Sequence, residues 1–213
     1  DASHELKTPL AILSADLGLI EETEENRLWL ESGQEQIQRM DSLIKNLVEL
    51  ARSEEALPPS AVAAVPFSEL AEGCIENFRP LAESAGKELT AEISPGLCVS
   101  GVPDDISRLL TILLDNAVKY GAEGGHITLT LEKMDRQARL TVSNPGDPIP
   151  PEHLAHLFER FYRADASRGE KSGFGLGLAI ADTIAWEHKG ALKAESDAAS
   201  TRFTFTMPLR KQA

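Results

Sequence analysis

The sequence has little cysteine and no long apolar run. Its two cysteines, Cys74 and Cys98, are far apart and form no CxxC pattern. This spacing excludes a disulfide framework or a usual zinc site and predicts reduced thiols in the cytosol. No apolar run approaches the roughly 18 residues of a membrane span, and no signal-peptide pattern is present. We therefore expect that nothing in this sequence spans a membrane or is exported.

Basic residues are also in the minority. The chain has 34 acidic and 21 basic residues, which gives a formal net charge of −13. Such a charge repels a phosphate backbone and argues against a broad nucleic-acid surface. We expect no direct nucleic-acid partner, and any bound anion must be held by local donors.

The length is nevertheless sufficient for a substantial core. With 213 residues, of which 42% are hydrophobic, the chain has room for one ordinary domain and a smaller element. There are no internal repeats. The sequence starts without Met inside a helical pattern, so we expect it to be part of a longer protein.

The first part of the chain has apolar residues at alternating spacings of four and three, which is typical of a coiled-coil seam. The first seam comprises Leu6, Leu10, Leu13, Leu17 and Ile20, and the second comprises Ile37, Met40, Ile44, Leu47 and Ala51. The polar run 22–26 separates them, which predicts an antiparallel helical hairpin over residues 1–57. Because a hairpin cannot close a core alone, we expect a homodimer with a four-helix bundle.

A proline-rich stretch follows this hairpin and predicts an interdomain linker at residues 58–64. Beyond it, in residues 65–213, strand-like and helix-like patterns alternate. Helices are predicted over 67–86, 104–121, 151–162 and 178–188, and strands over 88–93, 126–134, 138–144, 191–196 and 201–209. This order predicts an α/β sandwich, with a mixed sheet and helices on one face. The class of the whole chain is α+β.

Three stretches of this second part contain chemically suggestive residues. The run KSGFGLGLAI (171–180) places glycines directly before a helix, where bare backbone N–H groups can hold phosphate or simply form a tight turn. In LLDNAVKYG (113–121), Asn116 and Lys119 are one helical turn apart and offer a metal-binding carbonyl and a cation. Both could equally be surface residues. The aromatic residues of 142–165 are compatible with a core role.

Together and in this order, these stretches closely resemble the sensor histidine kinases of two-component systems. SHELKTPL resembles the phosphoacceptor box and LLDNAVKYG the asparagine box, while NPGDP, LFERFYR and GFGLGL resemble the first glycine, phenylalanine and second glycine boxes. The resemblance covers essentially all 213 residues. The ATP-binding fold of the family is shared with DNA gyrase, mismatch-repair ATPases and a heat-shock chaperone, which lack the histidine hairpin.

The resemblance implies an ATP-dependent protein-histidine kinase. It makes His4 the nucleophile that takes the γ-phosphoryl group of Mg-ATP, and Glu5 its acid/base partner. The phosphoryl group then passes to an aspartate of a response regulator. Thr8 lies at i+4 from His4, on the same helix face, and a threonine there orients water for dephosphorylation of the regulator.

The resemblance also implies the nucleotide site and its cofactors, ATP and Mg²⁺. Asn116 is the implied magnesium ligand, Lys119 a phosphate contact and Tyr120 a wall of the pocket, while Asn144 reads adenine and Gly146 gives the base close access. A lid over the phosphates is expected at residues 163–175. The remaining expected nucleotide contacts are Arg163, Gly173, Gly175, Leu176, Gly177, Leu178 and Thr201.

The chain departs from the family pattern at three positions. Ile112 replaces a frequent first asparagine one turn before Asn116, and Asn144 replaces the usual aspartate. An asparagine carbonyl can still accept a hydrogen bond from the adenine amino group, but without the strength that a charge adds. Pro148 replaces the second glycine of its box. These departures bear on the affinity for ATP more than on the identity of the family.

Pro9 interrupts the helical pattern close to His4. Its ring would clash with the carbonyl of Glu5, four residues back, so we expect the helix to bend just below His4. Such a bend could expose the histidine in one state and hide it in another.

Two other functions remain open at this point. One is a phosphatase-biased scaffold dimer whose nucleotide site has decayed, which Ile112 and Asn144 would suggest. The other is a chaperone-like or repair-type ATPase, which gives no reason for SHELKTPL. On the kinase interpretation, the chain is the cytoplasmic portion of an inner- or plasma-membrane protein. It would be linked to the membrane only through an N-terminal sensor portion outside this sequence.

Overall fold

The computed structural model describes residues 10–15, 17–20, 23, 26–52, 62–163 and 174–210. The chain forms two units, Asp1–Glu55 and Ala56–Ala213. The predicted residues His4, Glu5, Thr8 and Gly173, and also Pro9, lie outside the described residues.

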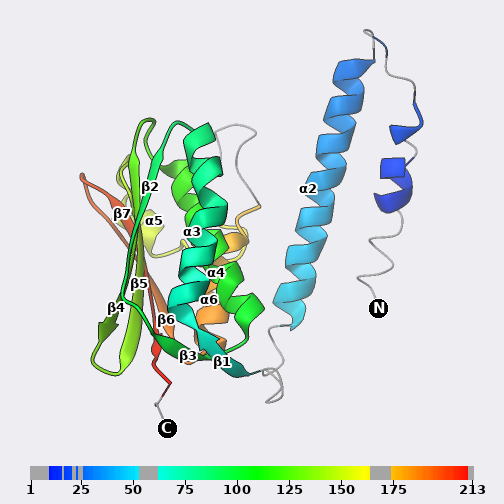
Figure 1. Cartoon of the computed structure of the whole chain (residues 1–213). Coiled ribbons are helices and arrows are strands. Elements are labelled where there is room, and N and C mark those ends of the chain that lie inside the picture. Colours follow the sequence, from blue (N-terminus) through cyan, green and yellow to red (C-terminus); the bar gives the residue numbers. More distant parts are fainter. Residues whose placement is uncertain are drawn as a thin grey trace. The chain divides into compact units, whose positions relative to one another are not determined.

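The N-terminal unit is helical. Residues 10–15 and 17–18 form helical turns, and α2 (Arg27–Arg52) runs beside them (Figure 1). A Cβ at Gly33 of α2 would lie 3.1 Å from Cδ1 of Leu17, so these two segments are in contact. Within one chain this contact covers only part of the predicted seam, because Leu13 and Met40 remain 51% and 50% exposed. Apolar side chains exposed in such a row favour a partner helix pair.

The C-terminal unit contains a mixed five-stranded sheet in the order β2-β4-β5-β7-β6. Its strands are β2 (Glu88–Ile93), β4 (His126–Met134), β5 (Gln137–Asn144), β6 (Ala191–Ser196) and β7 (Thr201–Pro208). Only the β2–β4 pair is parallel among the pairs of this sheet. Burial alternates along β5 and β7, as expected for strands with one face on a core.

Three helices cover one face of this sheet (Figure 1). They are α3 (Phe67–Ser84), α4 (Pro103–Tyr120) and α6 (Gly177–Glu187), and α4 packs against both of the others. The leucines of α4 are completely buried and face the inner side chains of the strands. Phe67 packs edge-on against Phe205 of β7, with ring centroids 6.2 Å apart. The α+β class and the placement of the helices on one face are therefore confirmed.

A second, two-stranded sheet was not predicted. In it, β1 (Ala63–Pro66) pairs antiparallel with β3 (Cys98–Gly101). β1 starts inside the stretch 58–64 that the sequence suggested as linker. The two strands of this second sheet are four residues each and lie far apart in the sequence, so the sequence contains no local hairpin signal for them.

The helix predicted over 151–162 is much shorter in the structure. α5 spans Pro151–Leu154, and turns follow it. A continuous helix up to residue 162 is excluded at Phe161, whose φ is +65° and whose N–H donates to the carbonyl of Gly175 at 2.9 Å. A helix cannot continue through a residue with positive φ.

Two further properties concern the cysteine thiols and the hydropathy of the helices. Both cysteines are free thiols, and burial raises the pKa of Cys74. Among the helices in the described ranges, none has the length and hydropathy that crossing a bilayer requires.

Candidate nucleotide-binding site

The C-terminal end of α4 brings three predicted site residues together. The helix starts with Pro103 at its first turn and ends at Tyr120, followed by Gly121. A Cβ at Gly121 would lie only 2.6 Å from the carbonyl oxygen of Ala117, so a glycine is required for this exit from the helix. The chain therefore leaves α4 immediately after Asn116, Lys119 and Tyr120, which places them at one end of the core.

Asn116 is half-buried and has a fixed orientation. Its Nδ2 donates to the carbonyl of Ile112 at 2.9 Å. Within the described part of the chain, its Oδ1 accepts no hydrogen bond. An uncharged carbonyl oxygen is a suitable ligand for Mg²⁺, which is usually bound by few protein oxygens plus substrate phosphates. No cluster of three or more His, Cys, Asp or Glu side chains suited to a metal occurs among the described residues.

Lys119 and Tyr120 are more exposed. The Lys119 ammonium lies 2.6 Å from Oδ2 of Asp115, one turn back on the same helix, and both side chains are partly exposed. A phosphate would have to compete with this carboxylate for the ammonium. Tyr120 is 53% exposed, so its ring is available to line a pocket.

The end of β5 supplies a buried polar residue. Asn144 is only 4% exposed, and its Nδ2 donates to the carbonyl of Pro145 at 3.2 Å. In the sheet register it lies opposite Thr201, which is 6% exposed. Thr201 lies in turn opposite Ser196, with the two hydroxyl oxygens 2.7 Å apart. Buried polar groups at the end of a sheet, above an apolar core, are typical of a ligand site.

Gly146 lies in the loop after β5, next to the end of α4. A Cβ there would lie 3.0 Å from the carbonyl oxygen of Tyr120 and 3.7 Å from Nδ2 of Asn144. The Pro145 carbonyl accepts a hydrogen bond from Ala122 at 2.7 Å, which ties the loop after β5 to the loop after α4. A side chain at position 146 would therefore crowd Tyr120 and Asn144.

The start of α6 completes the arrangement. Gly175 has a φ of +69°, and a Cβ there would lie 2.6 Å from the carbonyl oxygen of Tyr162, so glycine is required. Leu176 is buried, and Gly177 and Leu178 open the helix. No side chain of the described ranges caps this N-terminus. Its first N–H groups are therefore available to an anion.

Ile112 explains how α4 and α6 meet. A Cβ on Gly177 would lie 3.4 Å from Cγ2 of Ile112, so the side chain of position 112 packs beside the first residue of α6. Arg163, the first residue of the expected lid, is exposed and interacts with another group. Apart from Arg163, the predicted nucleotide contacts in the described ranges lie in α4, at or just after the end of β5, at the start of β7, and at or just before the start of α6.

Ser196 and Lys87 were not predicted. Ser196 Oγ accepts a hydrogen bond from the N–H of Ile149 at 2.9 Å and so holds the loop after Asn144. Lys87 is buried, and its ammonium donates to the carbonyl of Val118 in the last turn of α4. A lysine directly before a predicted strand gives no sequence signal of burial, and the position of Ser196 follows only from strand register.

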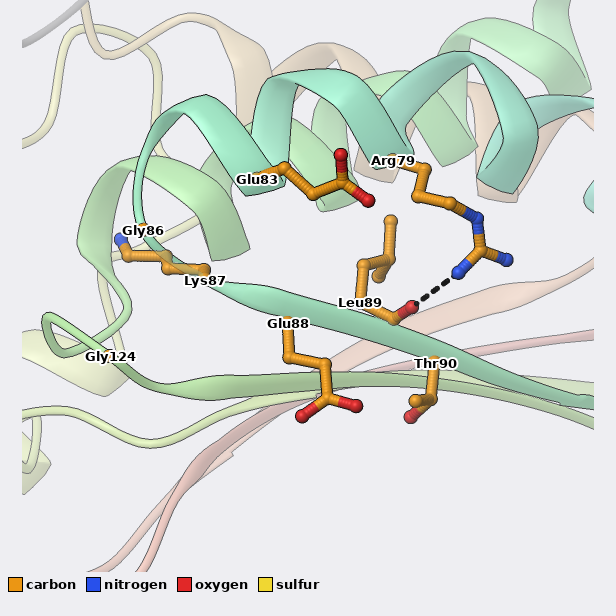
Figure 2. Close-up of a pocket in the computed structure, with 8 residues that line it drawn as sticks. All are labelled: Arg79, Glu83, Gly86, Lys87, Glu88, Leu89, Thr90 and Gly124. Carbon is orange, nitrogen blue, oxygen red and sulfur yellow. Dashed lines mark hydrogen bonds between the residues drawn. The ribbon is translucent and has the colours of Figure 1, made fainter.

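A separate pocket of about 520 Å³ lies between α3 and β2 (Figure 2). Its lining consists of Arg79, Glu83, Gly86, Lys87, Glu88, Leu89, Thr90 and Gly124. Arg79 donates to the carbonyl of Leu89 at 3.1 Å, and the nitrogen of Lys87 is turned away from Glu88. None of the predicted nucleotide residues lines this pocket.

Two of the carboxyl groups with raised pKa values, Asp105 and Glu187, lie at the ends of α4 and α6 that are opposite to the candidate site. Desolvation raises the pKa of Asp105 in the first turn of α4, and His188 partly offsets this shift. Desolvation, with a smaller contribution from the charge of Asp105, raises the pKa of Glu187 at the end of α6. Both carboxyl groups lie near His188. This histidine therefore contributes to the packing between α4 and α6.

Comparison with known proteins identifies the family. Residues 101–211 match the model of the histidine kinase-, DNA gyrase B- and HSP90-like ATPases, and residues 1–56 match the His kinase A phospho-acceptor domain. The chain is 32% identical over 98% of its length to sensor protein DltS of Streptococcus agalactiae, covering 53% of that protein. It is 34% identical over 98% of its length to sensor histidine kinase CusS of Escherichia coli, covering 44% of it.

A solved structure agrees with this result. Full-length ShkA in complex with AMPPNP aligns with a TM-score of 0.83 and 26% identity, over 100% of this chain and 45% of ShkA. The chain belongs to the two-component sensor histidine kinases, and its C-terminal unit has their ATPase fold. It spans about half the length of the curated relatives that it matches.

Proposed function

We propose that this chain is the kinase core of a sensor histidine kinase, which phosphorylates His4 from Mg-ATP. The observation that carries the proposal is that a phospho-acceptor domain match at residues 1–56 and an ATPase match at residues 101–211 occur in one chain. The division into 1–57, linker 58–64 and 65–213 is part of this proposal.

The described residues fit a nucleotide with its magnesium ion. The uncapped N–H groups at the start of α6 suit the phosphates, and Gly146, which has no side chain beside Asn144, would give the base close access. Asn116 would hold Mg²⁺ through Oδ1, and the ion would neutralise developing negative charge on the phosphates. ShkA, which was solved with AMPPNP, supports nucleotide binding by this fold.

The proposed phosphoryl transfer needs little chemistry from the protein beyond positioning. One ring nitrogen of His4 attacks the γ-phosphorus, the bond to the β–γ bridging oxygen breaks, and ADP leaves. Glu5 accepts a hydrogen bond from the other ring nitrogen and so keeps the attacking lone pair free. The phosphoryl group then moves to an aspartate carboxylate of a response regulator.

Two further parts of the proposal concern the homodimer and the dephosphorylation of the response regulator. The half-exposed seam residues Leu13 and Met40 support a homodimer through the hairpin. Thr8, one turn after His4, would orient the water that dephosphorylates the regulator. We place this core on the cytoplasmic side of a membrane-anchored sensor, and the names of the relatives, a sensor protein and a sensor histidine kinase, support a sensory role.

The test is incubation of residues 1–213 with γ-labelled Mg-ATP, beside His4→Gln and His126→Gln variants. His126 is an exposed histidine that contacts Glu88 and Thr90, so its replacement is a matched control. We expect acid-labile, alkali-stable label in the wild type and the control, and none in His4→Gln. Label that persists in His4→Gln, or steady phosphate release without protein-bound label, would contradict the proposal.

A decayed nucleotide site is the second candidate, and Ile112 is the observation that bears on it. Ile112 packs beside Gly177 and its carbonyl orients the Asn116 amide, so position 112 is part of an ordered contact. This arrangement favours an intact nucleotide site over a decayed one. Calorimetric titration with Mg-ATP separates the two, because a decayed site would bind no nucleotide.

A further inference from the structure

A groove lies between α6 and β6, apart from the candidate nucleotide site. It has a volume of about 330 Å³ and is lined by Asp182, Thr183, Trp186, Gly190, Ala191 and Leu192. These residues belong to the last two turns of α6 and to the chain that enters β6, whereas the candidate nucleotide contacts of α6 lie at its start. Among the described strands, β6 pairs only with β7 and is the edge of the sheet. The groove therefore lies at an open edge.

Trp186 is the most prominent residue of this groove. It is 75% exposed, more than any other large apolar side chain that the structure describes in the C-terminal unit. Its indole has no ring contact within the described ranges. An indole offers a large apolar area and a π face that attracts cations. Single exposed apolar residues are nevertheless common, so Trp186 alone does not define a site.

Asp182 adds a carboxylate on the same side of the helix. It lies four residues before Trp186, so the two side chains are neighbours on the helix surface. Asp182 is half-buried, and desolvation raises the pKa of its carboxyl group. Within the described part of the chain, this carboxylate has no hydrogen bond and no ion pair. Because an unpaired charge loses hydration when it is buried, a cation placed beside it would offset that loss.

The other charged residues near the groove do not supply such a cation. Lys193 follows the buried Leu192 on β6, and successive side chains of a strand point to opposite faces, so Lys193 faces away from α6. Lys189 comes directly after α6 and forms no ion pair with Asp182. Glu187 is a further acidic residue, and it lies on the side of Asp105. The potential at the groove is therefore negative.

From these observations we propose that the groove binds an arginine side chain of a partner protein. A guanidinium group can stack on the Trp186 indole through its planar face and donate to the Asp182 carboxylate through its edge. The compact ammonium of a lysine lacks this planar face. A free small cation fits the groove less well, because an indole that is so exposed covers little of a small ligand. Tryptophan and arginine are also typical of the strongest contacts in protein–protein interfaces.

The experiment follows the indole N–H signal of Trp186 by ¹H–¹⁵N NMR in the 1–213 chain. Trp29→Phe removes the only other indole of the sequence. The probes are the peptide acetyl-Gly-Arg-Gly-amide and its citrulline counterpart, in which a neutral urea group replaces the guanidinium. We expect a saturable shift with the arginine peptide and a dissociation constant on the order of 1–10 mM. The citrulline peptide should bind at least about tenfold more weakly.

A matched pair of variants tests the carboxylate. In D182N we expect the dissociation constant of the arginine peptide to rise at least about fivefold. E72Q removes the same charge from an exposed position of α3 and should keep the wild-type value. This comparison separates the groove from general attraction of a basic peptide to an acidic chain.

Four results would overturn the proposal. They are the absence of a saturable shift, equal binding of the arginine and citrulline peptides, equal affinities in D182N and E72Q, and equal binding of the corresponding lysine peptide. An indole signal that moves on dilution of the chain alone, but not in D182N, would assign the groove to a second copy and would also overturn it. None of these results depends on nucleotide binding, so the proposed function is tested separately.

Discussion

His188 joins two of the helices that carry the site, and its replacement is a quantitative test of the packing. Nδ1 must donate to the carbonyl of Ile184, at 2.8 Å, because a carbonyl only accepts. Nε2 accepts from the N–H of Val102, at 3.0 Å, the residue that precedes α4. The imidazole is only 5% exposed, and these two hydrogen bonds fix its orientation.

The expected loss of stability in H188L follows from the hydrogen bonds that the Ile184 carbonyl and the Val102 N–H lose. The Ile184 carbonyl keeps the backbone N–H of residue 188 as a donor, so only one net hydrogen bond is lost there, about 1 kcal/mol. The Val102 N–H loses its acceptor, which costs about 1–3 kcal/mol where it is shielded from water. We expect H188L to lower the free energy of unfolding by about 2–4 kcal/mol. H188Q, which can still offer Oε1 to Val102, should cost about 1 kcal/mol.

The assay is urea unfolding followed by tryptophan fluorescence in a Trp29→Phe background. The chain has two tryptophans, so Trp186, two residues before His188, is then the reporter. Equal slopes against urea would show that the same transition is compared. Wild-type stability in H188L, or equal losses in H188L and H188Q, would refute the role assigned to the Val102 hydrogen bond.

Two further predictions concern the proposed chemistry. In N116A we expect affinity for ATP to fall at least about tenfold with Mg²⁺ and to stay unchanged in EDTA, as measured by titration. An equal loss without magnesium would contradict the role of Oδ1. In T8A we expect dephosphorylation of the response regulator that this chain phosphorylates fastest in a panel to fall at least about tenfold, with autophosphorylation retained. A parallel loss of both activities would argue against a water-orienting hydroxyl.

The main elements of the C-terminal unit were predictable because their patterns are local. β5 and β7 alternate buried and outward residues, and the apolar residues of α4 recur on one helical face. The helix predicted over 151–162 was wrong beyond Leu154. Its apolar pattern is helical, but the backbone at Phe161 is set by a hydrogen bond to Gly175, which is remote in sequence. Pairing of β1 with β3 is similarly non-local.

The candidate site was predictable only where a motif identifies it. Asn116, Asn144 and Gly146 lie in sequence motifs; the structure has Asn116 in the last two turns of α4, Asn144 at the end of β5, and Gly146 in the loop after β5 beside Asn144 and Tyr120. Ser196 and Lys87 belong to no motif. Their roles depend on strand register and on burial of a lysine beneath the end of α4, which follow from the assembled fold.

The hydrogen bond between Phe161 and Gly175 has a consequence for how this family can diversify. It ties the two ends of the intervening segment together by backbone atoms. Once the ends of a loop are joined, each doubling of its length costs only about 0.6 kcal/mol of closure entropy. Insertions between these two residues should therefore leave Gly177 and the start of α6 in place. Related kinases can then differ in the length of this segment without rebuilding the site that it adjoins.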